Sequence, residues 1–301
     1  MKLRIHLEYV HPWPNHIGLF VARAKGWYAA HGWDVDIISD GHDRGNPSDL
    51  VAAGEYQVAS VRLGELIEYR HTEVPLVGVA TFNQCQLPGV FGRKSDGIHR
   101  WRDLEGKHVS IPPSPRLTHM VHEAVEADGG NFDLLNVTHP EFWEPDMRAI
   151  EKGTFDAVFN VLGWEPYQGC TPVEDITFLD FDQVGVAPHH AYFVCFTQEM
   201  CDSEPQLVRD FLEATARGYR FAAENPEEAI ALAGSPMCNM DPEVLRLSLE
   251  HMRPTWFAPS GRWGEIQPEL VRSYTQWMID GGFTTASLED IEGAVTNDFL
   301  P

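Results

Sequence analysis

Two histidines in the first turn of the sequence are placed where they could bind a ligand or move a proton. His11 and His16 flank the segment "PWPN", whose prolines restrict the shape of the turn. A neutral imidazole can hydrogen-bond a small molecule or transfer a proton near neutral pH. Because surface and structural histidines are commoner than functional ones, neither histidine alone establishes a site.

A single arginine ends the apolar segment "YQVASVR", at a position where an apolar residue would be expected. The planar guanidinium of Arg62 is suited to a carboxylate, sulfinate or phosphate, which it can bind through two parallel hydrogen bonds. The alternative is a structural ion pair with Glu65 or another nearby acid. The sequence favours both interpretations about equally.

The segment "SIPPSPRLTHM" predicts the start of a helix at which an anion could bind. Ser114 is placed to cap this helix, Pro115 lies in its first turn and Arg116 follows directly. The backbone N–H groups of a helix start can accept an anion, although ordinary capping without a ligand is the alternative.

Several further imidazole and aromatic side chains are candidates for ligand contact, and each has a structural alternative. His119 and His122 are spaced like a pair of metal ligands, but no third ligand is evident, so we expect a solvated helix face and no metal site. The remaining candidates could bind or stack on a flat ligand, or could belong to the core: His189, His190, Trp13, Trp164 and Phe82.

The elements that must position these side chains alternate between strand and helix. Apolar periodicity predicts strands over 2–10, 33–39, 56–62, 74–82, 106–113, 155–161 and 191–197. It predicts helices over 17–32, 46–55 and 114–130, and two helices within 203–234 that are divided at "NP". This rhythm predicts parallel α/β sheets covered by helices on both faces. Ligands of such sheets collect beyond the carboxyl ends of the strands. The segments at those ends are Val10–His16, Asp40–Asn46, Arg62–Glu65 and Pro112–Arg116, which adds Asn15, His42 and Glu65 to the candidates.

Composition narrows the class of protein. The 301 residues carry a net charge of −23, which opposes binding to nucleic acid or to anionic membranes. No segment is apolar enough to span a membrane, and the sequence shows no hydrolase GxSxG motif, P-loop or GxGxxG motif. The five cysteines form no CxxC pair, so we expect reduced thiols. The start of the chain lacks a secretion signal, which predicts a cytoplasmic protein, or a periplasmic or cell-surface one from which a signal was removed.

The segment "NHIGLFVARAKGWYAAHGWDVDI" resembles the opening signature of ABC-transporter substrate-binding proteins, in their sulfonate and thiamine-pyrimidine branch. "LEGKHVSIPPSP", "KGTFDAVFN", "FLEATARGYRFAAENPEEAIALA" and "VTNDFLP" match later signatures of the same family. The resemblance implies a two-lobed α/β fold of the type II periplasmic-binding class, with a ligand cleft at the hinge. We expect lobe I to comprise residues 1–83 and 188–301, and lobe II residues 84–187.

Cytoplasmic enzymes share this scaffold. Hydroxymethylpyrimidine phosphate synthases resemble the sequence near "NPSDLVAAGEYQVASVR", but their lysine is replaced by Arg62, and "VAPHH" lacks their cysteines. Aryl sulfinate desulfinases resemble it at "VHPWPN" and "RLGE", but their nucleophilic cysteine falls on His11. Their substrate-holding arginine corresponds to Arg62.

We therefore expect a solute-binding protein that captures a small planar anionic or heteroaromatic ligand between two lobes, without a cofactor and with a membrane permease as a possible partner. The alternative is a cytoplasmic lyase, a decarboxylase or desulfinase acting on an aromatic acid. In that case Arg62 would hold the acid group, and His11 or His189 would move the proton.

Overall fold

The computed structural model describes residues 2–39, 46–70, 72–141, 145–182, 184–234, 237, 240–291 and 293–301. The chain forms two α/β units. Unit 1 comprises residues 1–85, 189–279 and 284–301, and unit 2 comprises residues 86–188 and 280–283. The expected boundaries between the lobes lay between residues 83 and 84 and between residues 187 and 188, and residues 280–283 were expected in lobe I.

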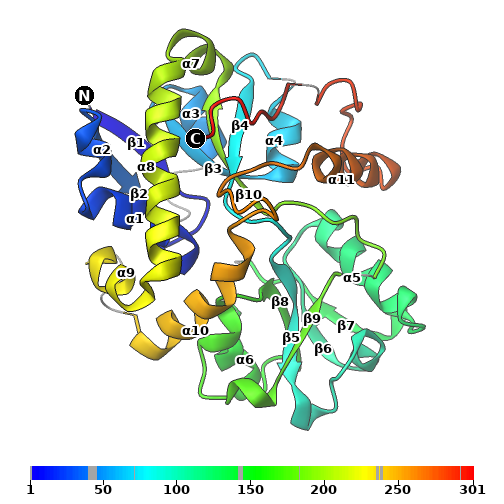
Figure 1. The fold of residues 1–301 in the computed structure, drawn as a ribbon. Coiled ribbons are helices and arrows are strands. Elements are labelled where there is room, and N and C mark those ends of the chain that lie inside the picture. Colours follow the sequence, from blue (N-terminus) through cyan, green and yellow to red (C-terminus); the bar gives the residue numbers. More distant parts are fainter. Residues whose placement is uncertain are drawn as a thin grey trace. The chain divides into compact units, whose positions relative to one another are not determined.

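Unit 1 is built on a five-stranded sheet of order β2-β1-β3-β10-β4. Its strands are β1 Lys2–His6, β2 Asp34–Ile38, β3 Val58–Arg62, β4 Leu76–Thr81 and β10 Tyr192–Thr197. Its helices are α1 Ile17–Ala24, α2 Trp27–Ala30, α3 Pro47–Ala52, α4 Leu63–Tyr69, α7 Gln198–Ser203, α8 Pro205–Glu224, α9 Pro226–Ala233, α10 Pro242–Met252 and α11 Pro268–Asp280, whose last residue belongs to unit 2 (Figure 1).

The sheet of unit 1 is mixed, so the prediction of an entirely parallel sheet was wrong. β1 runs parallel to β2 and β3, as expected for strands joined through helices, but β10 is antiparallel to both β3 and β4. β10 follows the chain's return from unit 2 rather than a helical crossover inside unit 1. The direction of such a strand is therefore not set by the βαβ rule.

The helix predicted over 17–32 is in fact two helices. Gly26 has φ 71°, a left-handed conformation that favours glycine, and it separates α1 from α2. α1 packs closely against α8, because Gly18 and Gly218 meet without side chains between them. This packing holds the turn that precedes α1 against the body of unit 1.

Unit 2 has its own five-stranded sheet, of order β7-β6-β8-β5-β9. Its strands are β5 Pro88–Arg93, β6 His108–Ser110, β7 Asn136–Thr138, β8 Ala157–Val161 and β9 Ile176–Asp180, and its helices are α5 Pro115–Ala127 and α6 Met147–Glu151. Here β5 is antiparallel to β8 and β9, whereas β6 pairs in parallel with β7 and β8. One of the unit's core clusters is apolar and fully or nearly fully buried: Phe91, Met147, Ile150, Val158, Leu162 and Ile176.

The structure agrees with the predicted fold class, since the chain forms two units that each combine a five-stranded sheet with helices, and the chain passes from unit 1 to unit 2 and back. Among the described residues, none of the helices has the length and apolar character needed to cross a bilayer.

Candidate ligand-binding site in unit 1

The loop that leaves β1 contains a buried carboxylate and imidazole in contact. His16 Nε2 lies 3.0 and 3.1 Å from the two carboxylate oxygens of Glu8, and both side chains are fully buried. Burial alone would raise the pKa of Glu8, but the attraction and hydrogen bond of His16, with a smaller effect of Ser60, lower this pKa to about 2. Glu8 is therefore a carboxylate at neutral pH.

Arg62 lies at the end of β3 beside two acidic residues. Its Nη1 donates to Glu65 Oε1 at 3.2 Å, and its Nη2 donates to the backbone oxygen of Glu8 at 3.5 Å. Burial opposes the charge of Arg62, but attraction by Glu65, Tyr192 and Glu8 outweighs burial and raises the pKa of the guanidinium. The side chain of Arg62 remains 30% exposed and that of Glu65 26% exposed, so both can still meet a ligand.

The charges at this edge of the sheet are balanced rather than positive. Of the two interpretations of Arg62, the structure shows the ion pair with Glu65, and Glu8 adds a second carboxylate nearby. An anion bound at Arg62 would have to compete with both carboxylates. The surroundings of Arg62 therefore favour a ligand that has no net negative charge.

His11 lies in the same loop and is partly exposed. Its Nδ1 donates to the backbone oxygen of Pro12 at 2.9 Å, which leaves the lone pair of the neutral ring on Nε2. Burial, together with repulsion from His16, lowers the pKa of His11 below its usual 6.5, against the opposing effect of the Pro12 hydrogen bond. His11 can therefore accept a hydrogen bond or a proton at neutral pH.

Two other candidates in this turn, Trp13 and Asn15, are completely buried. Asn15 exchanges two side-chain hydrogen bonds with Asn83, of 2.8 and 3.0 Å, and accepts a third from Trp256 Nε1 at 3.1 Å. Together with the buried His16, these residues fix the shape of the turn. They would therefore support a ligand site rather than contact the ligand.

Both members of the second histidine pair are buried. His190 is completely buried, and both of its ring nitrogens are hydrogen-bonded: Nδ1 donates to Asn83 O at 2.9 Å, and Nε2 accepts from the backbone N–H of Gln267 at 3.0 Å. His189 stacks on Tyr274 with ring centroids 3.9 Å apart. Both ring nitrogens of His190 are thus engaged in structural bonds.

The remaining predicted site residues lie in unit 2 or outside the described structure. Ser114 caps α5 by accepting from the Leu117 N–H at 3.5 Å, so fewer amide groups are available for an anion than we expected. Arg116 is half-buried in the first turn of α5, and Trp164 is buried. His42 lies outside the described residues.

The sequence analysis did not identify Glu8 and Asn83, whose side chains hold the turn through hydrogen bonds with His16 and Asn15. Glu8 belongs to the alternating segment "LRIHLEYV", where an acidic residue reads as the solvent-facing position of a strand. The strand instead ends at His6, and the chain turns so that Glu8 meets His16. A single sequence contains no signal for that pairing.

Known proteins resemble the chain over most of its length. Residues 13–229 match the family described as NMT1/THI5 like. The formylaminopyrimidine-binding protein of Halalkalibacterium halodurans is 26% identical, with 88% of this chain and 82% of that protein covered. The riboflavin-binding protein RibY of Chloroflexus aurantiacus is also 26% identical, with 94% and 81% covered.

Solved structures confirm the fold. The alkanesulfonate-binding protein SsuA of Xanthomonas axonopodis pv. citri, bound to MOPS, matches with a TM-score of 0.70 and 11% identity, covering 98% of each chain. The relatives support the predicted class, a substrate-binding protein of the ABC-transporter type, and confirm the resemblance seen in the sequence. Because the family match covers more than half of the residues, the chain belongs to the NMT1/THI5-like family.

Proposed function

We propose that this protein is a solute-binding protein of an ABC importer, and that it captures a flat heteroaromatic molecule without net negative charge. The observation that carries the proposal is the balance of charge around Arg62, whose guanidinium is paired with Glu65 and lies beside the ionised Glu8. Of the two ligand classes that the sequence left open, planar anions and heteroaromatics, this balance favours the second.

The chemistry of the pair suits the edge of an aminopyrimidine-like ring. Arg62 supplies N–H donors and Glu65 supplies carboxylate acceptors, side by side. Such a ring presents a nitrogen that accepts and an amino group that donates. The side chain of Glu65 is 26% exposed, so its carboxylate can accept a hydrogen bond from a donor on the ligand. The relatives named for formylaminopyrimidine and riboflavin support the same ligand class.

Calorimetric titration of the purified chain tests the proposal. The probes are a formylaminopyrimidine, riboflavin and, as an anion of comparable size, MOPS. We expect at least one heteroaromatic probe to bind and MOPS to bind at least tenfold more weakly. Tighter binding of MOPS, or binding of MOPS alone, would show that the site is built for an anion.

The lyase alternative can be tested with the same samples. The neutral His11 is the observation that favours it, because its Nε2 could accept a proton. In that mechanism His189 is the other candidate for proton transfer. Incubation of the chain with an aromatic carboxylate or sulfinate, followed by chromatography, would reveal turnover. If the unmodified chain forms product and His11→Asn does not, the protein is a lyase that uses His11, and the proposed binding function is wrong.

A permease partner and a location outside the cytoplasmic membrane follow from the proposed function, since a binding protein of an importer meets its solute before transport. Of the two locations that the sequence left open, we therefore propose the periplasmic or cell-surface one. Fractionation of the native cells tests it: the protein should be recovered outside the cytoplasm, and recovery with the cytoplasmic proteins would contradict it.

A further inference from the structure

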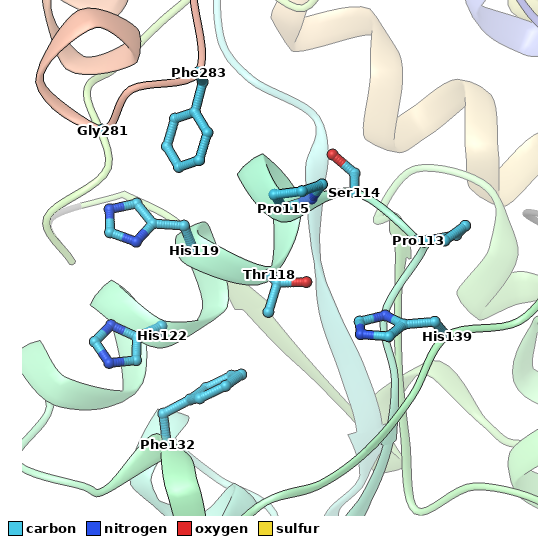
Figure 2. A pocket seen from close by; sticks show the side chains of 10 residues that line it. All are labelled: Pro113, Ser114, Pro115, Thr118, His119, His122, Phe132, His139, Gly281 and Phe283. Atoms are coloured by element: carbon cyan, nitrogen blue, oxygen red, sulfur yellow. The ribbon is translucent and has the colours of Figure 1, made fainter.

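Unit 2 contains a second feature able to bind a small molecule, a pocket of about 690 Å³ beside α5. Three imidazoles and two phenyl rings form much of its wall (Figure 2). Its volume lies in the range of small-molecule sites, which are mostly apolar with a few polar groups. The lining residues are Pro113, Ser114, Pro115, Thr118, His119, His122, Phe132, His139, Gly281 and Phe283.

The rings of this wall are arranged in pairs. His119 and His122, one turn apart on α5, are nearly parallel, with an interplanar angle of 8° and centroids 6.0 Å apart. Phe283 lies 5.2 Å from His119, and Phe132 lies 5.2 Å from His122, centroid to centroid. The two phenyl rings thus flank the imidazoles and provide apolar faces on which an aromatic ring could pack.

The charge of the wall is unusual for this chain. None of the ten lining residues is acidic, although the chain has a net charge of −23. His119 Nε2 lies 3.5 Å from Glu123, but His122 makes ring contacts and no hydrogen bond among the described residues. His139 donates its Nδ1 proton to Ile111 O at 2.9 Å, so a second proton would make its Nε2 a donor as well. His122 and His139 can therefore supply N–H groups to an anion.

The start of α5 contributes little to this recognition. Pro115 has no N–H group, and the N–H groups of Leu117 and Thr118 already donate to the side chain and backbone of Ser114. Among the described residues there is no cluster of three or more His, Cys, Asp or Glu side chains that could hold a metal ion. The imidazoles and the phenyl rings are what remains to select a ligand.

We propose that this pocket binds a small aromatic carboxylate, with its ring packed against Phe132 and Phe283 and its carboxylate accepting a hydrogen bond from one of the two imidazoles on opposite sides of the pocket, His122 or His139 (Figure 2). The proposal is independent of the ligand of unit 1, since every residue that it uses belongs to unit 2.

Titration of the whole chain with benzoate at pH 6.0 tests the proposal. We expect saturable binding that weakens at least tenfold in the double variant His122→Asn with His139→Asn. The matched control is His99→Asn, which changes an exposed histidine of unit 2 outside the pocket and should bind benzoate as the unmodified chain does. Circular dichroism would establish that each variant is folded. If the double variant fails to fold, Phe132→Leu takes its place, again with at least a tenfold loss expected.

Two further probes test the ligand class. Acetate lacks the ring and benzyl alcohol lacks the charge, so each should bind at least tenfold more weakly than benzoate. Equal binding of either probe, absence of benzoate binding, or binding unaffected by the pocket variants would overturn the proposal. Loss of benzoate binding in Arg62→Gln would also overturn it by assigning benzoate to unit 1, whereas an unchanged affinity in that variant would support it.

Discussion

At the scale of single residues, the property that defines the candidate site is the pairing of the charged side chains around Arg62. Arg62 alone would attract anions, but Glu65 is already hydrogen-bonded to it and the charge of the buried Glu8 also acts on it. Glu8 in turn is held as a carboxylate by His16. The candidate site therefore places the guanidinium of Arg62 near two carboxylates, and Arg62 and Glu65 are its partly exposed members.

The lowered pKa of Glu8 predicts a pH-dependent contribution to stability. Because its pKa in the folded chain is about 2, below the ordinary 4.5, the ionised form favours folding. This stabilisation is complete above pH 4.5 and is lost as the pH falls towards 2. At pH 7 we expect Glu8→Gln to lower the free energy of unfolding by about 2 kcal/mol.

Urea unfolding of the two proteins between pH 7 and pH 2 would measure this effect. The difference between them should shrink below pH 4.5, whereas the exposed control Glu73→Gln should differ little from the unmodified chain throughout. A difference that stays constant down to pH 2 would be inconsistent with an ionised Glu8 in the fold.

His11 should also reduce stability on acidification, but in a higher pH range than Glu8. Burial disfavours its charged form and lowers its pKa below 6.5, so protonation of this ring opposes folding and stability falls as the pH drops below 6.5. In an NMR titration, the His11 ring resonance, assigned by its loss in His11→Asn, should have a midpoint below 6.5. A midpoint above 6.5 would rule out the neutral ring that we assign to it.

At the scale of elements, the turn before α1 depends on how closely α1 packs against α8. A Cβ at Gly218 would lie 2.0 Å from the backbone carbonyl oxygen of Gly18, so the two helices would have to move apart. We therefore expect Gly218→Ala to destabilise the chain by about 3 kcal/mol, although alanine is the better helix former.

The matched control lies two residues away in α8. Ala216→Gly should lower stability by only about 1 kcal/mol, the ordinary penalty for glycine in a helix. Thermal unfolding of both variants would compare them. If Gly218→Ala were as stable as the unmodified chain, the close approach of the two helices would be wrong.

Most elements could be predicted from the sequence, and the failures have physical causes. Periodicity located β1, β2, β3, β4, β6, β8 and β10, because their alternation or apolar runs report burial directly. It did not reveal the break at Gly26, since apolar spacing continues across the glycine. It also could not give the direction of β10, which depends on where the chain re-enters unit 1.

At the scale of the whole molecule, the candidate site was only partly predictable. Arg62 and His11 could be proposed from the sequence because each is a polar residue at the end of a predicted strand or directly after it; their role in binding stays a prediction. The balancing role of Glu8 could not, because it depends on a contact between residues eight positions apart in an irregular loop. Considered alone, Arg62 favours an anionic ligand. Because Glu8 and Glu65 lie close to it, an anionic ligand is less well supported than a heteroaromatic one.

The most direct test of this account measures how ligand preference changes when the charge of Glu65 is removed. The probes are a formylaminopyrimidine and MOPS, titrated into the unmodified chain and into Glu65→Gln. We predict that the heteroaromatic binds at least tenfold more weakly to Glu65→Gln, and that MOPS binds more tightly to it, because Arg62 has lost its partner. If MOPS already binds the unmodified chain more tightly than the heteroaromatic, and Glu65→Gln changes neither affinity, the balance of charge around Arg62 does not select the ligand.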